Sequence, residues 1–185
     1  FISPIFTDSH QLVSIGPKIT IQMSNPSTSG HRTSDKRYFC LYCDKPFAKL
    51  KPHLISQHGS CMEVAEMLSK GKEMNKYLQK IRNLGNHRHN CKVLQEASGV
   101  LIVVYRPTVA KSYADDYFPC PFCFGWYEKG QLWRHSKDRC DWKPADCSTE
   151  GRVISKSRFL IPVPESIRPN TREVMSHMQR DQVFL

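Results

Sequence analysis

The sequence contains no long apolar segment, and its longest apolar run is the six residues VLIVVY at positions 100–105. A membrane-spanning helix needs about 20 predominantly apolar residues, so that class of protein is excluded. The first residues also lack a basic segment followed by an apolar one, which argues against a secretory signal peptide. We therefore expect an intracellular protein in a reducing compartment.

Acidic residues are scarce relative to basic ones. The chain of 185 residues has 17 Asp and Glu against 27 Lys and Arg, which gives a formal net charge of +10. Such a balance points to a polyanionic partner, first nucleic acid and second an acidic membrane surface. Charge alone does not choose between these two partners.

Eight cysteines are present, and four of them form two Cys-x-x-Cys pairs followed by histidines at metal-ligand spacing. In a reducing compartment this pattern indicates metal binding rather than disulfides. A tetrahedral Zn²⁺ ion takes one ligand pair from a turn and one from a helix face. In residues 38–58, Phe47 and Leu50 occupy the places where a small zinc finger keeps its core side chains. The predicted ligands of this first stretch are Cys40, Cys43, His53 and His58.

The same pattern returns at residues 117–140. Tyr127 and Leu132 stand at the two core positions, and an aromatic residue again lies two places before the first cysteine. Such an internal repeat is hard to obtain by chance, so we expect a second zinc ion. A thiolate replaces the second histidine here, and Cys147 is an alternative to Cys140 as the fourth ligand, although the spacing favours Cys140. The predicted ligands of this second stretch are Cys120, Cys123, His135 and Cys140.

The two stretches differ in the length of chain before the first histidine. Nine residues separate Cys43 from His53, and eleven separate Cys123 from His135. A groove-reading finger has about twelve there, and the three residues missing from the first stretch are close to one helical turn. This argues against base reading by the first stretch in the usual way. The alternative for that stretch is a zinc ion that only stabilises the local fold.

Both stretches resemble the two-Cys, two-His zinc-finger superfamily, and the second resembles its two-Cys, His, Cys variant. The resemblance implies zinc binding more specifically than DNA binding. The run of residues 37–142, with IRNLGNHRHN, LIVVYRP and YFPCPFCFGWYEKGQLWRH, is similar to the N-terminal region of an uncharacterised animal family. Some members of that family are linked to mobile elements and have recombinase-like C-terminal parts. This resemblance implies a fragment, the DNA-targeting part of a larger protein whose catalytic residues lie beyond Leu185.

Two helices are expected between the zinc stretches. Ser60 and Glu63 form a candidate capping box at the start of a short first helix. A second helix is predicted from Lys72 to Leu84, and Gly85 is a natural stop. Their apolar faces, at helical spacing, comprise Val64, Met67 and Leu68 and then Met74, Tyr77, Leu78, Ile81 and Leu84.

Basic side chains gather in two places. Lys72, Lys76 and Lys80 stand four residues apart on the polar face of the second helix, as a solvated face or a row of phosphate contacts. Near the second stretch, Trp126 and Trp133 with adjacent cations suit nucleic-acid contact, unless the tryptophans are core residues. The predicted nucleic-acid-binding residues are Lys72, Lys76, Lys80, Arg134, Lys137 and Arg139.

The apolar run at 100–105 is bounded by Gly99 and Pro107 and predicts a strand with both faces covered. It should pack on the helical block or lead into the second zinc stretch. Cys61, His87, His89 and Cys91 are candidates for a third site. The alternation of the last three gives poor tetrahedral geometry, so we favour buried or solvated side chains.

These features predict a small α+β protein with two zinc-stabilised ββα-like fingers separated by a basic helical block and a strand. The Ser/Thr/Pro/Gly-rich residues 24–35 cannot bury enough apolar surface to order themselves. The expected organisation is a disordered lead-in at 1–36, fingers at 37–60 and 113–143, the helical block and strand at 61–107, a linker at 144–170 and, at 171–185, the start of a helix of a further region.

The leading hypothesis is a nuclear module that binds two Zn²⁺ ions and contacts nucleic acid, with DNA as the first expectation. The alternative is a zinc-stabilised adaptor for protein partners. A third class is a metal-dependent nuclease, because His87, His89 and Asn90 faintly resemble a His-Asn-His motif. No carboxylate cluster or His-x-Glu pair lies near them, so we expect no catalytic residues. Neither a membrane nor a small-molecule substrate is expected.

Overall fold

The computed structural model describes residues 19–24, 35–108, 113–145 and 153–163. Within these ranges no helix has the length and apolar character needed to cross a membrane. The elements in chain order are β1 (Ile19–Ile21), β2 (Tyr38–Phe39), β3 (Pro46–Phe47), α1 (Leu50–His58), α2 (Met62–Ser69), α3 (Met74–Gln95), β4 (Gly99–Leu101), β5 (Tyr117–Pro119), β6 (Trp126–Glu128), α4 (Lys129–Arg134) and α5 (Val153–Arg158).

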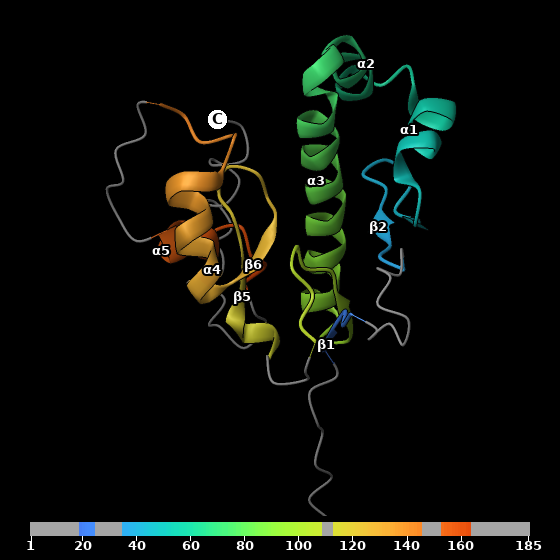
Figure 1. Cartoon of the computed structure of the whole chain (residues 1–185). Coiled ribbons are helices and arrows are strands. Elements are labelled where there is room, and N and C mark those ends of the chain that lie inside the picture. Colours follow the sequence, from blue (N-terminus) through green and yellow to red (C-terminus); the bar gives the residue numbers. More distant parts are fainter. Residues whose placement is uncertain (1–18, 25–34, 109–112, 146–152, 164–185) are drawn as a thin grey trace, which may run out of the picture.

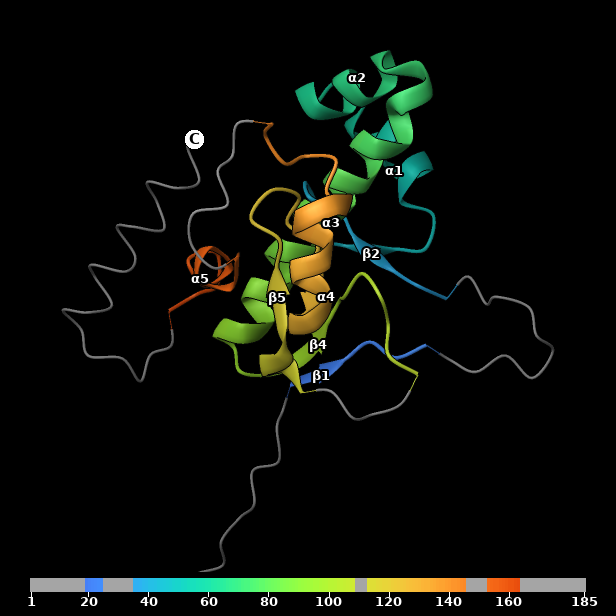
Figure 2. The same ribbon diagram turned by 60° about the vertical axis from the view of Figure 1, so that its left-hand side comes forward.

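Helix α3 runs through the middle of the molecule as its longest described element (Figure 1). On one side lie β2, α1 and α2, and on the other lie β5, β6, α4 and α5 (Figures 1 and 2). We call residues 38–58 the first module and residues 117–140 the second module. Each module is an antiparallel two-stranded hairpin followed by a helix. The protein is thus a mixed helix and strand structure in which both modules pack on one helix.

One face of α3 packs on the first module. Leu78 and Ile81 belong to a buried core that also contains Leu50 and Leu54 of α1 and Val64 and Met67 of α2. A side chain at Gly85 would overlap the carbonyl oxygen of Phe39. The prediction that the helix stops at Gly85 is wrong, because α3 continues to Gln95. The glycine is there to let the backbone of β2 touch the helix.

The opposite face of α3 meets the second module and the segment that leads to it. An α-helix turns about 100° per residue, so Asn83, His87 and Asn90 share one face. The side chain of Asn90 accepts a hydrogen bond from the Ile102 N–H at 2.8 Å and donates one to the Ile102 carbonyl at 3.0 Å. The indole N–H of Trp126 donates to Nδ1 of His87 at 3.1 Å. These bonds attach the second module to α3.

The predicted strand at 100–105 is shorter than expected. Only β4 forms, and it pairs in parallel with β1. The ladder ends because Asn90 takes both backbone groups of Ile102. Leu101, Ile102 and Val103 are buried, but Val100 and Tyr105 are exposed, so both faces are covered only in the middle of the run. The Val104 N–H then donates to the Trp126 carbonyl at 2.9 Å, so the segment packs on α3 and also joins the second module.

The N-terminal and C-terminal flanks contain more structure than the sequence predicts. Ile19–Ile21 lie inside the expected disordered lead-in, yet they form β1 against β4. Helix α5 lies inside the expected linker, and Val153 and Ile154 pack against the core of the second module. Residues 25–34 and the helix expected at 171–185 lie outside the described residues.

The capping box predicted for the first short helix is not present. Helix α2 begins at Met62 after Cys61, and no side chain caps it. The Glu63 carboxylate instead accepts a hydrogen bond from the Tyr42 hydroxyl at 3.2 Å. Val64 and Met67 are buried as predicted, whereas Leu68 is 41% exposed.

Replacing Asn90 with alanine should destabilise the fold by about 2 kcal/mol, because the buried N–H and C=O of Ile102 lose their partners. Urea denaturation measures this loss. Asn75→Ala is the matched control, since Asn75 is exposed on the same helix. Equal midpoints for the two variants would show that the Asn90 bonds add no stability.

Candidate metal centres and basic surface

The first cluster begins at the turn between β2 and β3. The Cys40 N–H donates to the Lys45 carbonyl at 2.9 Å, and the Asp44 N–H donates to the Cys40 carbonyl at 3.1 Å. Asp44 closes the turn with a φ of 56°, a left-handed conformation that aspartate tolerates better than most residues. This turn points the sulfur atoms of Cys40 and Cys43 in one direction.

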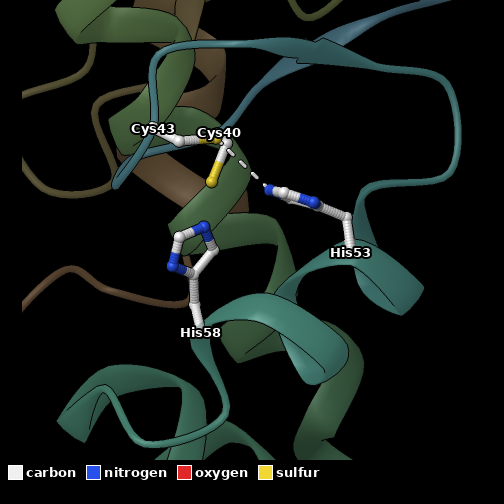
Figure 3. A group of neighbouring side chains, drawn as sticks. All are labelled: Cys40, Cys43, His53 and His58. Atoms are coloured by element: carbon white, nitrogen blue, oxygen red, sulfur yellow. Dashed lines mark hydrogen bonds between the residues drawn. The ribbon is translucent and has the colours of Figure 1, made fainter.

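Helix α1 supplies the other two side chains of the first cluster. Cys40, Cys43, His53 and His58 converge on one point (Figure 3), and their ligand atoms all lie within 4.8 Å of one another. The Cys43 sulfur lies 3.4 Å from Nε2 of His53. Nε2 of His58 is buried and has no hydrogen-bond partner among the described residues. A buried nitrogen without a partner suits a metal ligand.

The second cluster begins at a turn of the same form. The Cys120 N–H donates to the Gly125 carbonyl at 2.8 Å, and the Phe124 N–H donates to the Cys120 carbonyl at 2.9 Å. Phe124 has a φ of 60°, which is unusual for a bulky side chain. Its ring lies 5.3 Å from the ring of His87 on α3. The residue that closes this turn with a positive φ is therefore also the residue that contacts α3.

A π-helical turn completes the second cluster. Helix α4 passes directly into the π turn His135–Arg139. In a regular α-helix, residues five apart point about 140° away from each other. The wider π turn returns Cys140 to the side of His135, a use of such turns that is common at functional sites. The Cys123 sulfur lies 3.2 Å from Nε2 of His135, and the Cys120 and Cys140 sulfurs are 3.8 Å apart.

Both clusters fit the dimensions of a tetrahedral site. With Zn–S bonds of about 2.3 Å and Zn–N bonds of about 2.0 Å, two sulfur ligands lie about 3.8 Å apart, and a sulfur and a nitrogen about 3.5 Å apart. The observed sulfur–sulfur distance is 3.8 Å, and the sulfur–nitrogen distances are 3.2 and 3.4 Å. The structure brings all eight predicted ligands together as two groups that could each hold a metal ion.

Hydrogen bonds connect the thiol groups and the imidazole of the second cluster, and these bonds shift the pKa values of the groups. Hydrogen bonds with Cys123 and Cys140, together with burial, raise the pKa of Cys120. Hydrogen bonds from Cys120 and Cys123 lower the pKa of Cys140. Burial lowers the pKa of His135, but its bonds to the Cys123 and Cys140 sulfurs outweigh burial and raise that pKa to about 9. A divalent cation at this point would replace the shared protons.

Aromatic rings support the first histidine of each cluster. Phe47 stacks on His53 with ring centroids 3.7 Å apart, and Tyr127 stacks on His135 at 4.1 Å. Leu50 and Leu132 are fully buried beneath them. The core positions predicted from the sequence are therefore occupied as expected in both modules.

No third cluster of His, Cys, Asp or Glu side chains forms within the part of the chain that the structure describes. His89 stacks on Phe39 and bonds the Val100 carbonyl, whereas His87 lies toward Trp126 on another side of α3. Cys91 lies beside His87, and burial raises the pKa of its thiol to about 12. Cys147 lies outside the described residues.

The two sets of predicted basic residues lie in different environments. Arg134, Lys137 and Arg139 are exposed on α4 and the π turn. Trp133 is 57% exposed beside them, with the Lys137 ammonium 5.4 Å from its ring centre, whereas Trp126 is buried. Trp133 is therefore a surface residue and Trp126 a core residue.

The lysine row on α3 is not a free face. Lys72 is exposed, but the ammonium groups of Lys76 and Lys80 lie 5.2 and 3.9 Å from the ring centre of Trp142. Sequence reasoning missed Trp142 as a partner of α3, and it missed that Asn83, Asn86 and Asn90 of α3 itself are buried. The signal in the sequence was the recurrence of asparagine at helical spacing around Gly85, at positions 83, 86 and 90.

Phe39 and Leu41 of the first module also depend on α3. The Phe39 N–H donates to the Asn86 side chain at 2.9 Å, and Arg88 donates to the Leu41 carbonyl at 3.1 Å. Comparison with protein-family models, curated proteins and solved structures found no match, so no relative adds to what the two clusters and their surroundings show.

Proposed function

We propose that both clusters bind structural Zn²⁺ and that the protein contacts nucleic acid, with DNA as the first candidate. Two thiolates with two imidazoles, and three thiolates with one imidazole, are ligand sets that zinc prefers in closed tetrahedral sites. All four ligands come from the protein in each cluster, which leaves no coordination position for a substrate. The metals therefore stabilise the modules and perform no reaction.

The observation that carries the nucleic-acid proposal is the surface on α4 and the π turn. Arg134, Lys137 and Arg139 are exposed there together with Trp133. Cations release counterions when they neutralise phosphates, and an exposed indole offers a face for stacking. Helix α4 places six residues before His135, whereas α1 places only Leu50, Lys51 and Pro52 before His53. The second module thus presents the longer surface.

We also propose a nuclear location and a role as the targeting part of a larger protein, without catalytic residues in this chain. Both ideas rest on the net charge of +10 and on the resemblance of residues 37–142 to the N-terminal region of an uncharacterised animal family. An adaptor for a protein partner is the second candidate. It is favoured by the exposed apolar side chains Ile55, Met62 and Leu68 on α1 and α2, of which Met62 is 79% exposed.

Binding to duplex DNA at several salt concentrations tests the nucleic-acid proposal. The Arg134→Ala/Lys137→Ala variant should lower the slope of log affinity against log salt by about 1.8, because each lost phosphate contact removes about 0.9. Lys49→Ala/Lys51→Ala, at the start of α1, is the charge-matched control and should keep the slope. Binding without salt dependence, or no binding at low salt, would favour the adaptor.

A further inference from the structure

A pocket of about 320 Å³ lies between α3 and the second module. Its lining comes from the segment around β2, the polar face of α3, the segment before the second module and the second module itself. The second module contributes three side chains of the second cluster, Cys123, His135 and Cys140. The volume is at the lower end of the range for small-ligand sites, so it suits one nucleotide and is far too small for a double helix.

Apart from the side chains of the second cluster, the charges that line the pocket are mostly positive. Lys36, Lys76, Lys80 and Arg139 contribute cations, and Asp141 contributes a carboxylate. The ammonium groups of Lys76 and Lys80 both lie over the ring of Trp142. Two like charges over one ring repel each other, and an anion between them would offset that repulsion. The part of the pocket near Lys76 and Lys80 therefore favours a phosphate.

Lys36 adds a further cation to the lining of the pocket. Its ammonium group donates to the carbonyls of Val103 at 2.7 Å and Val104 at 2.8 Å, which uses two of its three donors. Burial, followed by the charges of Arg106 and Arg82, lowers the pKa of Lys36 to about 8. The group is still mainly charged at neutral pH, so it adds to the positive charge of the lining.

Aromatic and amide groups share the pocket with these cations. Tyr38, Tyr105 and Trp142 contribute ring surfaces, and Gln79 and Asn83 contribute side-chain amides. The Gln79 amide donates to the Asn83 carbonyl oxygen at 2.8 Å, which orients both groups. Rings bind the face of an unpaired base and amides bind its edge, whereas a simple phosphate site needs neither.

We propose that this pocket binds one unpaired nucleotide of a nucleic-acid strand, with its base against the aromatic rings and its phosphate at Lys76 and Lys80. The inference rests on the proposed function and makes it more specific. The surface on α4 accepts phosphates of any strand, while the pocket accepts only a nucleotide that is free of its complement. The protein then prefers single strands, ends or gaps to an intact duplex.

The test compares labelled oligothymidine with a duplex of equal length by fluorescence anisotropy, using the zinc-loaded protein. Wild-type protein should bind the single strand more tightly. Tyr105, which lines the pocket, is 57% exposed. Tyr105→Ala should weaken single-strand binding roughly tenfold through lost stacking, and Tyr105→Phe should restore most of it. Lys76→Gln/Lys80→Gln should lower the salt slope by about 1.4, because each phosphate contact on a single strand contributes about 0.7.

The control is Lys49→Gln/Lys51→Gln, which removes the same charge from the start of α1, outside the pocket. Tyr105 also packs on Tyr127, so its truncation removes a packing contact as well. The double lysine variant supplies a separate readout, the salt slope, that does not involve the Tyr105 ring. Equal affinity for the single strand and the duplex, or an unchanged slope in Lys76→Gln/Lys80→Gln, overturns the pocket but leaves the proposed function standing. Absence of binding to both probes at low salt overturns the two proposals together.

Discussion

A chelator that removes zinc is expected to unfold both modules and to abolish most of the helical circular dichroism signal. Binding of structural zinc contributes roughly 10 to 16 kcal/mol in finger peptides. The buried cluster that joins the hairpin and the helix of the second module consists of Cys120, Cys123, Tyr127 and Leu132, and two of these are candidate ligands. A core of that size cannot hold the hairpin and helix together without the metal.

Native mass spectrometry should find two zinc ions per chain. Cys40→Ser and Cys120→Ser should each retain one, since each variant disrupts one cluster. Cys61→Ser is the matched control because Cys61 belongs to neither cluster, and it should keep both ions. One or no zinc in the wild-type protein, or an unchanged circular dichroism spectrum after chelation, would contradict the assignment of two structural sites.

Gly85→Ala is expected to destabilise the protein by about 3 kcal/mol, more than an ordinary substitution in a helix. The new methyl group would overlap the Phe39 carbonyl oxygen and lie 3.0 Å from the Leu41 nitrogen. Both are backbone atoms of the first module, so the rotation of a side chain cannot relieve the overlap. Relief requires β2 to separate from α3, which also breaks the bond between the Phe39 N–H and Asn86.

Gly130→Ala is the matched control for this substitution. Gly130 lies in α4, and nothing comes within 4 Å of an added methyl group there. Alanine should stabilise that helix by about 0.5 to 1 kcal/mol. Thermal unfolding of the two zinc-loaded variants measures the difference. A Gly85→Ala protein as stable as Gly130→Ala would mean that β2 does not press on α3.

Metal ligation was accessible from the sequence because it depends on spacing within short segments. A Cys-x-x-Cys turn and two ligands on the following helix need only local geometry, and the eight ligands indeed form two clusters. The stacking partners of the histidines, Phe47 and Tyr127, follow from the same local pattern. Burial at Val64, Met67, Leu78 and Ile81 also follows, since apolar residues at helical spacing must cover each other.

The role of α3 was decided by tertiary structure. A glycine in a helical pattern can mark an end or a close approach, and only the position of β2 shows that Gly85 serves the second purpose. Lysines opposite an apolar stripe can face water or another segment. Only the position of Trp142, which packs against the core of the second module, shows that Lys76 and Lys80 lie over its ring. Likewise, a three-residue strand such as β1 exists only because β4 lies beside it. Local chemistry determined the candidate metal ligands. Contacts between distant segments, which no local spacing encodes, determined how the two modules join and where the pocket lies.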